Sequence, residues 1–127
     1  LKNLFGAINN PNKYHDSVGD PYIADVNAIP VIRNKIRLTI CDAITPQYEG
    51  GPPYMPQWTW QMDSVLLATD MVAMDHIGWQ IIEEKRKEHD LESLREVGRD
   101  PVYIRTAADA RHKLGTNNPE RIELVRV

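Results

Sequence analysis

Residues 49–61, EGGPPYMPQWTWQ, constrain the fold of this chain more than any other stretch. They include two glycines, three prolines, two tryptophans and one tyrosine, with a single charged residue. Proline removes a backbone donor and fixes φ, and glycine favours turns, so the segment cannot form a helix or a regular strand. We therefore expect a long loop between two regular elements, and its prolines should hold the aromatic side chains in a stiff arrangement.

The segments on either side of this loop have the patterns of strands. Apolar and polar side chains alternate in residues 35–42, KIRLTICD, which predicts a strand with one buried face. Residues 64–69, SVLLAT, form a short apolar run that is typical of a strand buried on both faces. The alternation in residues 121–127, RIELVRV, predicts a final strand.

Helical patterns occupy much of the remaining chain. Asp70 is a typical N-cap for a helix over residues 71–89, which is apolar in its first half and charged in its second. Asp20 and Pro21 begin a helix over residues 21–35 that Pro30 should end or kink. Shorter helices are expected at residues 90–98 and 102–114. This order of elements predicts an α/β fold with a mixed, partly parallel sheet flanked by helices.

Composition excludes several classes of protein. A length of 127 residues suits a single domain, and a net charge of -3 argues against a nucleic-acid partner. No apolar run reaches the ~20 residues of a membrane span. The only cysteine, Cys41, cannot form an internal disulfide or hold an iron–sulfur cluster, so the redox compartment stays open. No targeting signal is visible, which leaves both a bacterial cytoplasmic and an exported location open.

Acidic residues follow both inner strands and suggest a site. If these strands are parallel, Asp42 and Asp70 reach the same edge of the sheet, where ligands bind in α/β folds. The loop over residues 43–61 would then form an aromatic wall above that edge. Asp75 falls in the apolar half of its helix and needs a partner, because an unpaired buried carboxylate is costly. His15 lies in a polar loop near Lys13.

Each of these residues also has a plain structural interpretation. The tryptophans and Tyr54 would serve equally well to cover the end of a small core. Asp70 would be only a helix cap, and His15 only a solvated loop side chain. Cys41 is expected to be a buried, inert thiol.

Four blocks of the sequence resemble the DUF362 family. They are LKNLFGAINNPNKYH at the start, IADVNAIP, LTICDAI followed by EGGPP, and LLATDMVAMDHIGWQII. Their order and spacing match the family over most of residues 1–82, although DMVAMD stands where members often have DPVALD. The matching polar and turn positions are Lys2, Asn3, Lys13, His15, Asp25, Asn27, Asp42, Glu49, Gly50, Pro52, Asp70 and Asp75.

The resemblance implies a family whose activity is uncharacterised, so it predicts no reaction. It also implies that the chain is the C-terminal part of a longer protein and of a larger domain, which agrees with the abrupt start at Leu1. The missing N-terminal part would then be a partner of these residues. Some members carry ferredoxin-like cysteine clusters, but this chain lacks those cysteines, so no iron–sulfur cluster is expected within it.

Two hypotheses for function follow. In the first, an enzyme or ligand-binding domain has a polar pocket at the carboxyl ends of the strands, which takes a small molecule, an anion or a divalent metal such as Mg, Mn or Fe. The candidate catalytic residues are His15, Asp42 and Asp75. The candidate metal ligands are His15, Asp42, Glu49 and Asp75. The candidate ligand-binding residues are Lys2, Asn3, Lys13, Asn27, Glu49, Gly50 and Trp58.

The second hypothesis is a non-catalytic interaction module. Residues 49–61 would then dock on a partner chain, because tryptophan and tyrosine are enriched at the centres of interfaces. Self-association also remains open. The position of the acids distinguishes the two hypotheses, since a pocket requires that they lie together.

Overall fold

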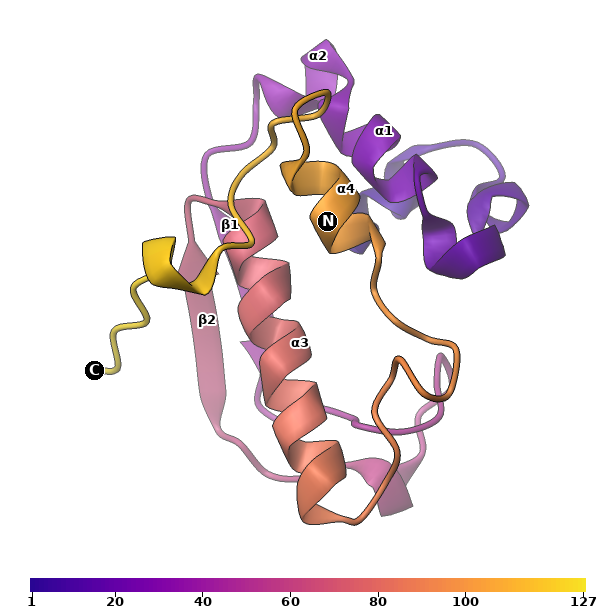
Figure 1. Ribbon diagram of the computed structural model, residues 1–127, viewed down its shortest axis with the longest axis vertical. Coiled ribbons are helices and arrows are strands. Elements are labelled where there is room, and N and C mark those ends of the chain that lie inside the picture. Colours follow the sequence, from indigo (N-terminus) through magenta and orange to yellow (C-terminus); the bar gives the residue numbers. More distant parts are fainter.

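The computed structural model describes residues 1–127 and combines helices with a small sheet. Helix α3 (Met71–Glu88) runs through the middle of the molecule, and strands β1 (Thr39–Ala43) and β2 (Ser64–Ala68) lie beside it (Figure 1). Helices α1 (Tyr22–Ala28), α2 (Pro30–Arg33) and α4 (Tyr103–Ala108) gather near the N-terminal end of α3. The 3-10 helices are η1 (Lys2–Ala7), η2 (Pro11–Tyr14), η3 (Asp16–Gly19), η4 (Pro56–Trp58) and η5 (Pro119–Arg121).

The two strands are antiparallel, so the prediction of a partly parallel sheet is wrong. Parallel neighbours need a crossover connection, usually an α-helix, whereas residues 44–63 contain only the short η4. The ladder instead continues beyond the strands into this connection. Tyr48 N donates to Trp58 O at 2.9 Å, and Met62 N donates to Ile44 O at 2.9 Å. The connection is therefore the wide end of a hairpin.

The antiparallel register separates the two acids that were expected at one edge. Asp42 pairs with Val65 at one end of the ladder, whereas Thr39 pairs with Ala68, next to Asp70, at the other end. Asp70 caps α3, because its Oδ1 accepts from the backbone N–H groups of Val72 and Ala73 at 2.8 and 2.9 Å. Its Oδ2 accepts from Thr116 N at 2.8 Å. The cap interpretation of Asp70 is confirmed.

Other local predictions have mixed outcomes. The break at Pro30 is confirmed, since α1 ends at Ala28 and α2 begins at Pro30. Asp20 makes no cap hydrogen bond to α1. Residues 90–98 form turns, and α4 covers only half of its predicted range. Residues 121–127 do not form a strand, because residues 123–127 make no backbone hydrogen bond with a neighbouring segment.

The hydrophobic core lies where α1, α4 and the beginning of α3 meet. Residues of the N-terminal segment complete it, and its ten buried members are Leu1, Phe5, Ile23, Ala24, Val26, Met71, Val72, Ile104, Ala107 and Leu114. The apolar first half of α3 enters this core and its charged second half extends away from it, as the sequence predicts. None of the helices has the length and apolar character needed to cross a membrane.

Candidate functional site

A cleft with a volume of about 510 Å³ runs along the open edge of β1. Four consecutive residues of this strand, 39–42, line it together with the N-terminal segment, α3 and the start of α4. Neighbouring side chains of a strand point to opposite faces, so a run of four lining residues means that the cleft follows the strand's edge. Four predicted site residues lie in it, namely Lys2, Asn3, Asp42 and Asp75.

Helix α3 supplies the inner wall of the cleft. Asp75 and Trp79 are four residues apart and lie on the same face of the helix, with Gly78 beside them. Met74 and Ile82 add apolar surface to this wall. The cleft therefore joins carboxylates to an apolar surface, an arrangement common in small-molecule sites.

Asp75 lies against the first residue of the chain and close to Tyr103. Its Oδ1 is 3.0 Å from the backbone nitrogen of Leu1, and its side chain is 17 % exposed. Burial, and then the charge and hydrogen bonding of Asp75, raise the pKa of Tyr103 well above its ordinary range. Tyr103 is therefore a neutral phenol at every physiological pH.

Cys41 is held as a neutral thiol in the same cleft. Burial is the largest cause that raises the pKa of Cys41, and the negative charges of Asp75 and Asp42 raise it further. A nucleophilic cysteine requires the opposite shift, towards the thiolate. Burial is the largest cause of the upward pKa shifts of Cys41 and Tyr103, and the negative charge of Asp75 adds to both.

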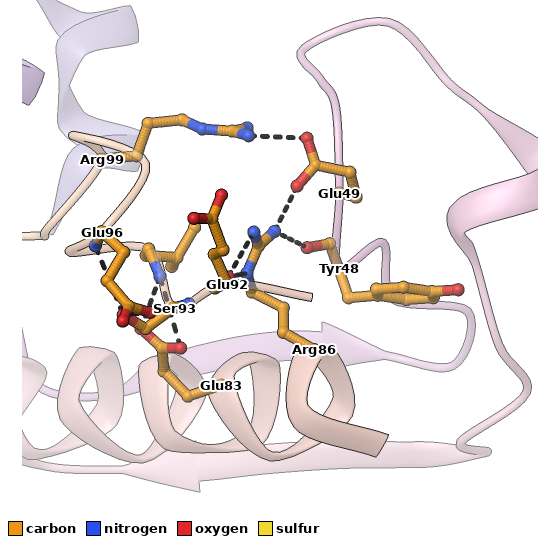
Figure 2. A network of polar contacts seen from close by, with 9 residues as sticks. Tyr48, Glu49, Glu83, Arg86, Glu92, Ser93, Glu96 and Arg99 are labelled. Carbon is orange, nitrogen blue, oxygen red and sulfur yellow. Dashed lines mark hydrogen bonds and ion pairs between the residues drawn. The ribbon is translucent and has the colours of Figure 1, made fainter. Parts of the chain in front are cut away.

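Glu49 lies outside this cleft, in an arginine cluster that Figure 2 shows. Its carboxylate pairs with Arg86 through one oxygen and accepts from Arg99 at 2.6 Å through the other. Hydrogen bonds from Arg99 and then Arg86 lower the pKa of Glu49 to about 2. Both carboxylate oxygens of Glu49 are thus bound to arginines of the same chain.

Arg86 is the centre of this cluster and is 2 % exposed. Its guanidinium donates to Tyr48 O at 2.9 Å and to Glu92 O at 2.9 and 2.7 Å, besides its pair with Glu49. The side chain therefore fastens the hairpin loop and the segment after α3 to the end of that helix.

The aromatic loop packs on the same end of α3. The Tyr48 ring is buried, stacks on His89 at 4.7 Å, and contacts Trp58 and Trp60 edge-on at 5.8 and 6.0 Å between ring centroids. Trp58 does not line the β1 cleft. The loop covers a small aromatic cluster, and its tryptophan Trp58 does not form the predicted wall above the acids.

The remaining predicted site residues are scattered. His15 Nδ1 lies 2.9 Å from Pro11 O, and its ring contacts Phe5, whereas Lys13 lies over the Tyr14 ring. Asn27 is buried and donates to Leu1 O at 3.0 Å and to Ile23 O at 2.8 Å. Gly50 adopts φ +72° in the hairpin loop. None of these residues lines the cleft.

Metal-ligating side chains are not gathered anywhere in the structure. No group of three or more His, Cys, Asp or Glu side chains is arranged to hold a metal ion. In particular, His15 and Glu49 lie away from the cleft that Asp42 and Asp75 share. The hypothesis of a metal site made of all four residues therefore gains no support from the structure.

Comparison with known proteins assigns the chain to a family. A family model described as "Domain of unknown function (DUF362)" matches residues 1–80. The chain belongs to the DUF362 family. No curated protein and no solved structure matches it. The part of the chain that DUF362 covers includes Lys2, Asn3, Asp42 and Asp75, the four predicted residues that meet in the cleft.

A second cavity of this DUF362 chain, of about 480 Å³, lies beside α1. Its only charged lining residue is Asp25, whose Oδ1 is already 3.1 Å from His112 Nε2 and 3.2 Å from an Arg111 nitrogen. The other ring nitrogen of His112 lies 2.9 Å from Asp109. The Asp25 carboxylate thus joins α1 to residues 109–112. Because this charged group already has partners within the chain, the β1 cleft is the better candidate site.

Sequence reasoning missed Tyr103 and the two arginines of the DUF362 chain that bind Glu49. Tyr103 lies 28 positions after Asp75, and nothing local indicates that α4 brings it to the cleft. Arg86 lies in the sequence EEKRKEH between Lys85 and Lys87. These two lysines carry the same charge as Arg86 and differ from it in the direction that they face around the helix. A buried arginine in such a run has no local signal, because the helix turn and its tertiary contacts select it.

Proposed function

We propose that the β1 cleft of this DUF362 chain binds a small polar molecule that carries a cationic group, such as a primary amine. The observation that carries the proposal is the meeting of Asp42 and Asp75, from different elements, in one cleft of about 510 Å³. That volume falls in the usual range of small-molecule sites, about 300–1,000 Å³.

The two carboxylates that line the cleft support a cationic ligand group. Burial and nearby carboxylates shift the pKa of both Cys41 and Tyr103 upward, so each stays protonated and neutral. Asp42 is exposed, and its Oδ1 accepts from Ile44 N at 2.9 Å, so the carboxylate still has free acceptor positions for a ligand.

The other lining residues support further features of the ligand. Trp79, Met74 and Ile82 offer an apolar surface against which a hydrocarbon or aromatic body can pack. Lys2 and Asn3 lie on the N-terminal side and suit a polar or anionic substituent. Binding is the role proposed here.

A matched pair of probes tests the proposed charge preference. Phenethylamine and phenethyl alcohol share an aromatic body and differ in the cationic group, so calorimetric titration of both isolates the contribution of charge. We expect the amine to bind at least about fivefold more tightly, which corresponds to about 1 kcal/mol. Equal affinity for both probes would contradict the proposal.

Variants locate the binding site. Asp42→Asn keeps the acceptor for Ile44 N but removes the charge, and should weaken amine binding by at least about fivefold. Glu123→Gln is the matched control, because Glu123 is exposed, makes no side-chain contact and lies outside the cleft. Titration with MgCl₂ is a separate arm, since two carboxylates can also hold a hydrated Mg²⁺. If Mg²⁺ binds more tightly than the amine, the ligand of the cleft is a metal ion and not an organic cation.

A docking role for residues 49–61 is the alternative. Tyr54 is exposed in this loop and leaves part of it available to a partner. The tryptophans, however, already pack against Tyr48 within the chain, which leaves less aromatic surface for docking.

A further inference from the structure

One face of the two-stranded sheet is apolar and uncovered. Ile40 lies directly opposite Leu67 in the register, so both point to the same face. Val65 lies two positions from Leu67 and shares that face, as does Asp42, which is opposite Val65 and two positions from Ile40. Leu38 immediately precedes β1. The exposed fractions of Leu38, Ile40, Val65 and Leu67 are 52 %, 65 %, 57 % and 64 %. We call these four residues the apolar sheet face.

The opposite face of the sheet is half-buried, in contrast to the apolar sheet face. Cys41 and Leu66 pair across it, and both are half-buried. Helix α3 lies beside the strands and contacts both of them (Figure 1). A two-stranded sheet with one face in water is marginally stable, and natural sheets bury such a face.

We propose that a second copy of this chain covers the apolar sheet face, so that the two sheets pack face to face in a symmetric dimer. The evidence for the dimer is separate from that for the ligand, although Ile40 belongs to this face and also lines the cleft. The same patch on both copies forms a self-complementary interface, as two-fold symmetry requires. Two stacked sheets place their inner side chains in a shared layer about 10 Å thick.

The area of the face fits such a dimer. Ile44 is also exposed at the end of the hairpin and extends the apolar surface. Five large side chains at roughly half exposure or more would each lose on the order of 100 Å², so two copies would bury roughly 1,000 Å² from these residues alone. This area approaches the lower end of the range of specific interfaces, about 1,200–2,000 Å².

Charges at the two ends of the hairpin are also complementary. Lys35 and Arg37 precede β1 and are exposed, whereas Asp42 and Asp63 are exposed at the other end of the ladder. A two-fold axis perpendicular to the strands reverses the second copy, so the basic end of one sheet meets the acidic end of the other. Such pairing favours the reversed orientation over the one with like charges together.

Sedimentation velocity tests the dimer directly. We expect the intact chain to change from monomer to dimer over a concentration series from about 1 to about 300 µM, a range that suits an interface of this size. The double variant Val65→Lys/Leu67→Lys places two charges in the face and should remain monomeric throughout. Neither residue lines the cleft.

A matched control separates this effect from surface charge in general. Val31 is 63 % exposed on α2, outside the sheet, so Val31→Lys should dimerise like the unmodified chain. Circular dichroism and thermal unfolding at low concentration should show that both variants keep the fold, because all three side chains already face water. A chain that is monomeric at every concentration, or a double variant that still dimerises, would overturn the proposal.

Discussion

Glu49 forms an ion pair with Arg86, a guanidinium that is 2 % exposed although it lies in the charged half of a long helix. The pair joins segments 37 positions apart. It explains why a loop rich in glycine and proline keeps a defined position: the Arg86 side chain also binds the carbonyl groups of Tyr48 and Glu92, one on each side of the helix end. The structural role of this charge network supports two predictions about stability, and two further predictions rest on His112 and Trp58.

Loss of Arg86 should destabilise the chain strongly. Arg86→Met keeps much of the aliphatic stem but leaves one carboxylate oxygen of Glu49 and two carbonyl groups without their donor, which typically costs about 3–5 kcal/mol. Arg95→Met is the matched control, because Arg95 is exposed and its side chain makes no contact. Urea unfolding of both variants measures the difference. Similar stability in the two variants would show that the buried arginine contributes little.

The same network predicts a loss of stability in acid. The two arginines hold the pKa of Glu49 near 2, below its ordinary value of 4.5. A depressed pKa means that the contribution is complete above the unfolded value and disappears as pH falls from about 4.5 to about 2, with an upper limit of about 3 kcal/mol. Glu49→Gln should therefore be less stable than the unmodified chain at neutral pH and approach it near pH 2. A constant difference across this range would contradict the ion pair.

His112 predicts a dependence on pH of opposite sign. Burial lowers the pKa of His112, but hydrogen bonds to Asp25 and Asp109 raise it more, so the net shift is upward from 6.5. Its stabilising contribution is therefore complete below about pH 6.5 and is lost as pH rises through the folded pKa. NMR titration of the imidazole should give a midpoint above 6.5, and His112→Gln should remove the corresponding change in unfolding free energy. A midpoint at or below 6.5 would contradict the contact with both carboxylates.

Trp58 separates packing from docking. Because its ring packs on Tyr48, Trp58→Ala should lower the unfolding free energy by about 2–4 kcal/mol. The folded protein should keep the oligomeric state of the unmodified chain in sedimentation velocity. Tyr54→Ala is the control, since Tyr54 is exposed in the same loop and should have little effect on stability. Weaker self-association in Trp58→Ala without loss of stability would favour docking through residues 49–61.

Local signals predicted much of the fold correctly. Proline at position 30, the cap at Asp70 and the change from apolar to charged residues in α3 each depend on neighbouring residues only, and all three are found as predicted. The predicted direction of the strands was wrong because direction depends on the path of the twenty-residue connection between them. The backbone hydrogen bonds that continue the ladder from Ile44 to Trp60 have no sequence signature beyond the turn residues.

The sequence grouped only some of the residues that line the cleft. Asp42, Asp75, Lys2 and Asn3 share it, although the acids were grouped on the expectation of parallel strands, which is wrong. Glu49 looked equivalent to them in the sequence, but buried Arg86 and exposed Arg99 bind it elsewhere. The role of a carboxylate depends on which cation lies next to it in the folded chain. That cation can come from a residue far away in the sequence, as Arg86 does for Glu49.

Chemical-shift mapping by NMR tests the central claim, a ligand cleft along the open edge of β1, most directly. The indole N–H of Trp79 gives a separate signal inside the cleft, and that of Trp58 gives an internal reference outside it. On titration with phenethylamine we expect the Trp79 indole and the amides of residues 39–42 to shift with one saturating curve, while the Trp58 indole stays constant. Shifts that are absent from the cleft, or equal at both tryptophans, would contradict the account.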